Sequence, residues 1–89
     1  MAHKDQAALS AELEAASALV EVGARYAHYK HPDREYIVRG LAILEATEEV
    51  AVIYEAQYGD RISFIRALSS WCDTVTHEGT SVLRFSKIG

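Results

Sequence analysis

The sequence predicts a mainly β protein in which an N-terminal amphipathic helix precedes a small, curled antiparallel sheet. Apolar residues recur about every 3.6 positions as far as Val22 and about every second position after Gly23. The later apolar segments are short and separated by turn-forming residues, which is typical of antiparallel strands. Because both faces of the central strands are apolar, we expect a barrel or roll of about five or six strands. The alternative is an open sheet with the helix across one face.

Residues 1–22 predict the helix. Asp5 is a suitable N-cap, and Gly23 stands where a left-handed residue ends many helices. Between them, polar side chains occupy one arc and apolar side chains recur at helical spacing, at Leu9, Leu13, Ala16 and Val20. We expect this helix to cover one end of the β core, and pairing with another subunit is the alternative.

Residues 23–89 predict the β domain, which fits a small SH3-like barrel. We expect strands over Arg25–Lys30, Glu35–Leu44, Glu49–Tyr58 and Ile62–Leu68, and a hairpin of Thr74–Thr76 with Ser81–Phe85. The expected reversals are His31–Arg34, Glu45–Glu48, Tyr58–Arg61 and Glu78–Gly79. Gly40 indicates a bulge or bend within its strand. Residues 69–73 predict a loop or a short helical turn.

Composition and charge exclude several classes of protein. At 49% hydrophobic and 25% charged residues, the chain is typical of a soluble globule. Its formal charge is -4 without an overall basic stripe, so general nucleic-acid binding is not expected. The single cysteine, Cys72, excludes an internal disulfide framework. No apolar run resembles a secretory signal or a membrane span, so we expect a cytoplasmic protein that does not bind membranes.

Several short motifs in the β domain occur in the order found in a bacterial family. They are Gly23-x-x-Tyr26-x-His28-Tyr29-Lys30, Val52-Ile53-Tyr54, Tyr58-Gly59-Asp60 and Phe64-Ile65-Arg66. On these motifs, the region from Gly23 to Phe85 resembles the family called domain of unknown function 1653 (DUF1653). The resemblance implies an SH3-type β-barrel and a family without an established activity.

The chain departs from the family pattern at three places. Where the family reads Arg-His-Ser-Glu, this chain has Leu44 in place of the histidine. Where the family reads Trp-x-Arg-Pro and later Met-Phe, this chain has Phe64-Ile65-Arg66-Ala67 and Trp71-Cys72. A site that used the family histidine is therefore not expected, whereas the Tyr-x-His-x-Lys strand and the arginine are retained.

The retained polar residues predict a ligand site. A phenol and an imidazole on one strand face can hydrogen-bond an anion or a carbonyl, an ammonium can attract its charge, and a guanidinium adds a two-pronged donor. The predicted ligand-binding residues are Tyr26, His28, Lys30, Tyr54, Asp60 and Arg66. The alternative is structural, with Tyr26 in the core, His28 bonded to a carbonyl and Lys30 extended into solvent.

Other chemical groupings are weaker. They are Cys72, His77 and Asp73 as nucleophile, base and orienting acid, and His28, His31 and Asp33 as metal ligands. The first set lies in no known catalytic motif, and the second has no established ligand spacing. The numerous tyrosines would suit a clamp for an extended segment, although tyrosines that alternate along strands are more often core. No catalytic residue, metal or cofactor is predicted.

The predicted function is a small non-enzymatic binding or adaptor module for a protein, a peptide or a small anionic ligand. One alternative is recognition of a nucleotide or RNA by a local basic face of Arg25, Lys30, Arg34 and Arg39. Another is a small hydrolase or transferase that uses His28 with Asp60 or a tyrosine. A homodimer also fits the sequence, because the small core, the strand edges and the helix all offer surface.

Overall fold

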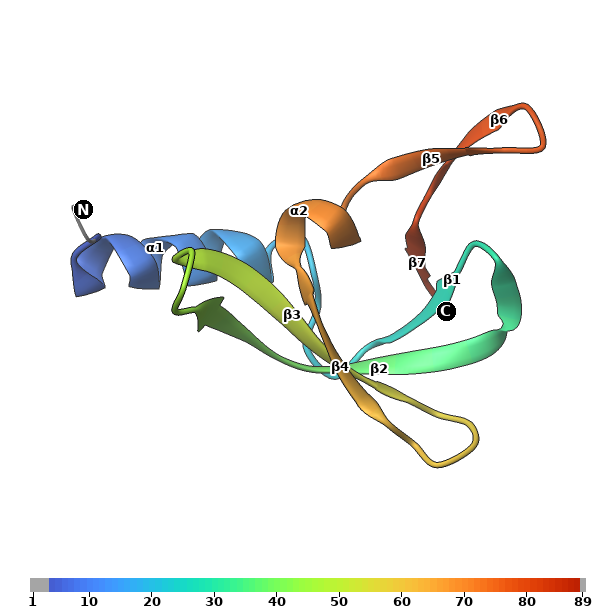
Figure 1. The fold of residues 1–89 in the computed structure, drawn as a ribbon, viewed down its shortest axis with the longest axis horizontal. Helices are drawn as coiled ribbons and strands as arrows, with labels where there is room; N and C mark the ends of the chain where they lie inside the picture. The colour runs from blue at the N-terminus through green and yellow to red at the C-terminus, as the bar shows by residue number, and fades with distance from the viewer. Residues whose placement is uncertain (1–3, 89) are drawn as a thin grey trace.

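The computed structural model describes residues 4–88. Residues 1–3 of the predicted range 1–22 and residue 89 of the predicted range 23–89 therefore lie outside the described residues. The elements in chain order are α1 (Gln6–Ser17), β1 (Arg25–His28), β2 (His31–Leu44), β3 (Glu49–Ala56), β4 (Ser63–Ala67), α2 (Leu68–Trp71), β5 (Thr74–His77), β6 (Thr80–Leu83) and β7 (Phe85–Lys87) (Figure 1). Five strands form an antiparallel sheet in the order β4-β3-β2-β1-β7, and β5 pairs with β6. The predicted mainly β fold with an N-terminal helix and antiparallel strands is confirmed.

The sheet curls but does not close into the expected barrel. Its edges are β4 and β7, and among the described residues no backbone ladder joins them. A barrel closes only when its edge strands exchange hydrogen bonds. Here side chains meet instead, because the Trp71 ring stacks on Phe85 at 3.8 Å and the Arg66 guanidinium lies over the same ring at 5.3 Å. We call this opening between β4 and β7 the seam.

Helix α1 begins where the sequence predicts and ends earlier. The Asp5 side chain caps it by accepting a hydrogen bond from the Ala8 amide at 2.8 Å. The helix stops at Ser17, and the following turn carries Val20 into the core, where it is 1% exposed. Burial of this side chain therefore outweighs continuation of the helix to Val22, and Gly23 lies in the next turn with φ of 90°.

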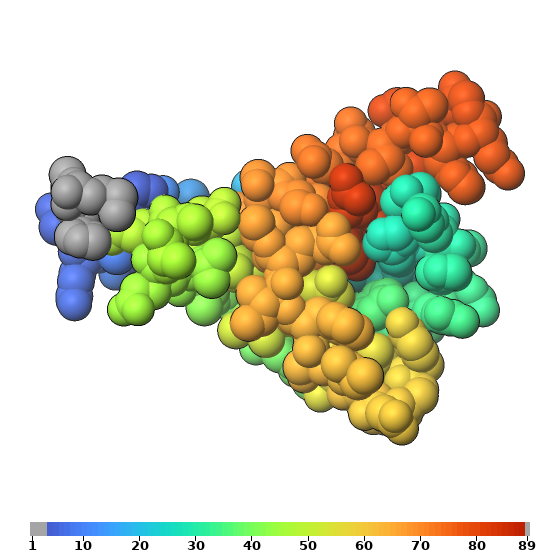
Figure 2. All heavy atoms as spheres, in the orientation of Figure 1, coloured from blue at the N-terminus to red at the C-terminus, as the bar shows by residue number. Residues whose placement is uncertain are grey.

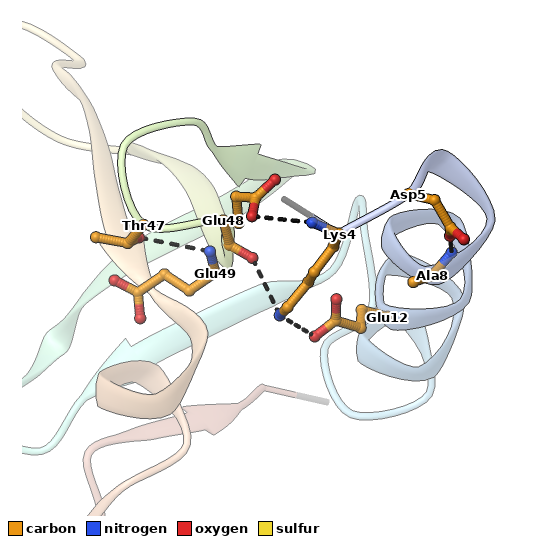
Figure 3. A network of polar contacts seen from close by, with 7 residues as sticks. All are labelled: Lys4, Asp5, Ala8, Glu12, Thr47, Glu48 and Glu49. Carbon is orange, nitrogen blue, oxygen red and sulfur yellow. Dashed lines mark hydrogen bonds and ion pairs between the residues drawn. The ribbon is translucent and has the colours of Figure 1, made fainter. Parts of the chain in front are cut away.

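Lys4 ties the start of α1 to the turn between β2 and β3 (Figure 3). Its ammonium donates to the Glu12 carboxylate at 2.9 Å, and its backbone amide donates to the Glu48 carboxylate at 3.2 Å. Both interactions are exposed, so each contributes little to the free energy of folding. They orient the helix against the far end of the sheet, away from β7 (Figure 1).

The predicted reversal at His31–Arg34 is wrong. The turn lies at Tyr29–Lys30, and β2 is one strand of 14 residues from His31 to Leu44. Pro32 is tolerated there because it has no pairing partner: the register of β2 with β1 passes from His31 directly to Glu35, and β3 pairs with β2 only from Tyr36 onward. The bulge predicted at Gly40 is confirmed by the register shift between Val38 and Gly40.

The C-terminal part matches the prediction as far as Leu83. Residues 68–71 form α2, and β5 and β6 make the predicted hairpin, with positive φ at Glu78 and Gly79. This hairpin projects from the rest of the molecule (Figure 2). The sequence prediction missed β7, because the segment Ser81–Phe85 was expected to be one strand. The chain instead bends at Arg84, and β7 pairs with β1.

Candidate functional site

A pocket of about 270 Å³ lies on the concave side of the curled sheet, and we call it the basic pocket. All five strands of the sheet and the β1–β2 turn contribute to it. Its lining residues are His28, Lys30, His31, Tyr36, Tyr54, Phe64, Arg66 and Phe85. Four of these side chains can carry a positive charge, and none of the described lining residues carries a carboxylate.

Arg66 is held in place by neutral partners. Its Nη1 donates to Ser70 Oγ at 3.0 Å, and its Nε lies 3.4 Å from the Tyr54 hydroxyl. Its guanidinium carbon is 5.3 Å from the centroid of the Phe85 ring, within the range of a cation–π contact. No carboxylate among residues 4–88 pairs with it, so its positive charge is not neutralised locally and Nη2 keeps its donors for a ligand.

His28 is held as a neutral ring with a defined tautomer. Its Nδ1 accepts a hydrogen bond from the Lys30 amide at 3.1 Å, so the proton of the neutral ring is on Nε2. Burial lowers the pKa of His28 below its usual value of 6.5, and nearby positive charges lower it further; these belong to Arg66, Arg84, His31 and Lys30. The lowered pKa therefore reflects burial first and the neighbouring positive charges second.

The floor of the basic pocket is aromatic. The Tyr54 ring lies 5.6 Å from both Phe64 and Phe85, measured between centroids. The Tyr36 hydroxyl bonds to the Tyr58 hydroxyl at 2.7 Å. Burial and this hydrogen bond raise the pKa of Tyr36 to about 12. Tyr36 therefore stays protonated and acts as a hydrogen-bonding wall rather than as a base.

The structure brings together four of the six predicted site residues: His28, Lys30, Tyr54 and Arg66. Tyr26 shares the strand face of His28, because β1 pairs regularly with β7 from Tyr26 to His28, but it is buried in the core, where it is 6% exposed and its ring packs against Trp71. The Tyr26 hydroxyl accepts a hydrogen bond from the Glu21 amide at 3.0 Å, beside the end of α1. The fold therefore gives Tyr26 the structural role that was the alternative prediction.

Asp60 also lies outside the basic pocket. It belongs to the turn between β3 and β4 and lines a separate hollow of about 90 Å³ with Tyr58 and Ile62. The lining residues that the site prediction missed are His31, Tyr36, Phe64 and Phe85. Phe64 was part of the family motif, but a sequence pattern does not reveal that β4 and β7 meet across the concave side.

The other groupings find no support in the geometry. Burial raises the pKa of the Cys72 thiol and the Asp73 charge raises it further, so the thiol stays protonated. His77 is on the projecting hairpin, where its ring contacts Tyr29. Within the described part of the chain, no three His, Cys, Asp or Glu side chains are placed to share a metal ion. No described helix is long and apolar enough to cross a membrane.

The proposed basic face is divided. Arg39 pairs with Glu55 at 2.9 Å, and Arg25 pairs with Glu35 at 3.3 Å. Strand alternation places these pairs on the convex side of the sheet, opposite the core residue Tyr36. The four arginine and lysine residues of that prediction therefore do not form one continuous cationic surface.

Comparison with known families identifies the fold. The model of the family described as protein of unknown function (DUF1653) matches residues 24–87, which include the whole of the five-stranded sheet. The chain belongs to the DUF1653 family. A crystal structure of a DUF1653 protein from Bordetella bronchiseptica is similar to it, with 32% sequence identity and a TM-score of 0.66. The similarity covers 75% of this chain and 86% of that chain. No curated protein matches the chain.

The DUF1653 pattern can now be placed on the structure. Leu44, which stands at the pattern's histidine position, is at the end of β2 opposite Glu49. It is not among the residues that line the basic pocket. The retained histidine and arginine, His28 and Arg66, both line that pocket. The substitution at Leu44 therefore leaves the basic pocket of this DUF1653 protein intact.

Proposed function

We propose that this DUF1653 protein is a small binding module that takes an anionic group into the basic pocket. The observation that carries the proposal is that the cations Lys30 and Arg66 converge with the hydrogen-bonding rings of His28 and His31 on one pocket with no carboxylate among its described lining residues. In a chain with a formal charge of -4, such a cluster is a local reversal of the electrostatic potential. An anion is the ligand that neutralises it.

The pairing of several cations outside the pocket supports this proposal. Arg25, Arg39 and Lys87 each lie within 3.3 Å of a carboxylate, so their charges serve the fold. Lys30 and Arg66 have no such partner among residues 4–88. Since an unpaired guanidinium beside aromatic rings is less well hydrated than one in open water, a ligand carboxylate or phosphate gains a stronger interaction there.

The shape of the sheet supports a binding role as well. We infer that the domain is an open form of the SH3-like roll, in which the unclosed seam leaves the concave side accessible. The aromatic floor adds affinity for a ligand that carries a flat or apolar portion next to its charge. The hydrolase alternative is less well supported, because His28 and Asp60 line different pockets.

Titration with benzoate and phenyl phosphate tests the proposal, and benzamide serves as a neutral compound of similar shape. We expect both anions to shift the amide NMR signals of His28 and Arg66, while benzamide does not. Arg66→Gln should weaken anion binding by about tenfold or more, the loss of one charge-assisted hydrogen-bonding group. Arg61→Gln is the matched control, because Arg61 lies on the β3–β4 turn and bonds to Gln57. Equal binding of benzamide and benzoate would overturn the proposal.

A further inference from the structure

The free edge of β4 borders the basic pocket. β4 pairs with β3 alone. The Ala56 amide donates to the Ile62 carbonyl at 3.0 Å, and this fixes which β4 residues exchange hydrogen bonds with β3. In an antiparallel ladder every second residue does so, which here means Phe64 and Arg66. The N–H and C=O groups of Ser63 and Ile65 therefore point away from β3, toward the free edge.

The side chains of β4 alternate in the opposite sense. Phe64 and Arg66 line the basic pocket, so Ile65 lies on the other face of the strand and is 66% exposed. The edge thus presents backbone donors and acceptors together with an apolar side chain on one face. On the other face of the same strand, Phe64 and Arg66 form part of the basic pocket. Natural edge strands are usually protected by charged side chains, proline or a bulge; β4 has no proline or bulge in residues 63–67, and its one charged side chain, Arg66, faces the pocket.

We propose that an extended acidic peptide adds to β4 as a further strand and places a carboxylate side chain in the basic pocket. The seam is where this strand would lie, since β4 and β7 meet there only through side chains such as Arg66 and Phe85. This inference rests on the proposed function, because it assigns the anionic group to a peptide side chain. Strand addition supplies backbone hydrogen bonds, and the pocket supplies specificity.

The geometry specifies the chemistry of the peptide. A residue directly opposite Arg66 in the added strand faces the same side as Arg66, so an acidic side chain there reaches the free guanidinium donors. The residues flanking it face the other side, where Ile65 is exposed, and β-branched apolar residues suit that position. The favoured segment is therefore an acidic residue between two β-branched ones.

The test uses the whole chain and two substitutions at one position. The Ile65 N–H points to the free edge, so Ile65→Pro removes an edge donor without removing a hydrogen bond to β3. Ile65→Thr keeps that donor and is the matched control. The probe is the acetylated and amidated peptide Thr-Val-Glu-Val-Thr, compared with the same peptide containing glutamine. Thermal unfolding of both variants verifies that they are folded.

We expect the glutamate peptide to shift the amide signals of Ser63 and Ile65 and to bind about tenfold more tightly than the glutamine peptide. Ile65→Pro should lower the affinity for the peptide by about tenfold relative to Ile65→Thr, while both variants bind benzoate equally. Only every second amide of an added strand donates to β4. N-methylation of those amides should block binding, whereas N-methylation of the amides between them should not.

Three outcomes would overturn the inference. If Ile65→Pro binds the peptide as well as Ile65→Thr does, the edge is not used, and benzoate binding would still support the proposed function. If benzoate also fails to bind the unmodified protein, the proposed function fails too. If light scattering shows a dimer that Ile65→Pro abolishes and the peptide does not displace, a second copy of the chain occupies the edge instead.

Discussion

The guanidinium carbon of Arg66 lies 5.3 Å from the centroid of the Phe85 ring, so the two edge strands of the sheet meet through side chains. The same arginine donates to Ser70 of α2 and lines the basic pocket. One residue thus connects the packing of the seam with the charge of the site. Substitutions of Arg66 should therefore affect stability and anion binding together.

Arg66→Ala should lower the free energy of unfolding by about 1–2 kcal/mol, because it removes the hydrogen bond to Ser70 and the contact with Phe85. Arg66→Lys should restore part of the anion affinity and little of the stability, since an ammonium lacks the planar fork. Urea unfolding of each variant measures the effect, with Arg61→Ala as the exposed control. A stability loss in Arg61→Ala equal to that in Arg66→Ala would contradict the assignment.

Trp71→Ala should destabilise the domain by about 3–5 kcal/mol, the usual cost of deleting a buried aromatic side chain. Trp71 is 3% exposed and stacks on Phe85 with the rings inclined by 4°. Ile65→Thr, at an exposed strand position, should change stability by less than about 1 kcal/mol. Chemical denaturation decides, and a small loss for Trp71→Ala would show that the stacked pair is not central to the core.

Stability should fall as the pH decreases below the usual pKa of His28. In the folded protein, burial lowers the pKa of His28 below the value of 6.5 expected for the unfolded chain. Between these two values the unfolded state binds more protons, so acid favours unfolding until the folded ring is also protonated. His28→Gln removes this contribution, and its stability should depend less on pH over that interval. Identical pH profiles of the two proteins, measured by urea unfolding, would exclude this role for His28.

Asp5→Ala should lower stability by about 1 kcal/mol and increase hydrogen exchange at the Ala8 amide, which loses its hydrogen bond of 2.8 Å. Asp5→Asn preserves an acceptor oxygen and should retain most of the protection. The exchange rate of the Ala8 amide is the most direct measurement. Equal exchange in both variants would mean that the cap is not maintained in solution.

Two glycines provide a matched test of backbone conformation. A Cβ atom would meet nothing within 4 Å at either Gly79 or Gly40, but only Gly79 has a positive φ, of 78°. Gly79→Ala should therefore destabilise the β5–β6 turn by about 1 kcal/mol, whereas Gly40→Ala should be neutral or slightly stabilising. Thermal unfolding distinguishes them, and a reversed order would contradict the assigned turn conformation.

Local chemistry explains why much of the fold could be predicted. Asp5 at the helix start, the bulge at Gly40 and the turn at Glu78–Gly79 follow from conformational preferences that neighbouring residues carry. Pro32 misled the prediction, because residues 32–34 extend along β2 without pairing, and pairing resumes only at Glu35 with β1 and at Tyr36 with β3. That limit is set by the partner strand and cannot be read from the local sequence.

The site could be predicted only in part for a similar reason. His28, Lys30, Tyr54 and Arg66 were identified by residue type and now line one pocket. Tyr26 was grouped with them by the two-residue rhythm, and it does share the strand face of His28, but Trp71 and the end of α1 enclose it in the core. Phe85 reaches the pocket because β7 pairs with β1. These two strands are the last and the first of the sheet in the sequence, so local patterns do not reveal their contact.

The β5–β6 hairpin leaves and re-enters the domain at a single point, because the Arg84 amide donates to the Asp73 carbonyl at 2.9 Å. Residues 74–83 can therefore be exchanged for inserts of other lengths with loss of the contact between the His77 and Tyr29 rings, while β7 keeps its pairing with β1. An epitope tag or a fluorescent reporter inserted between Asp73 and Arg84 would project from the surface of the molecule. The tagged protein could then be used to isolate whatever it binds in cells.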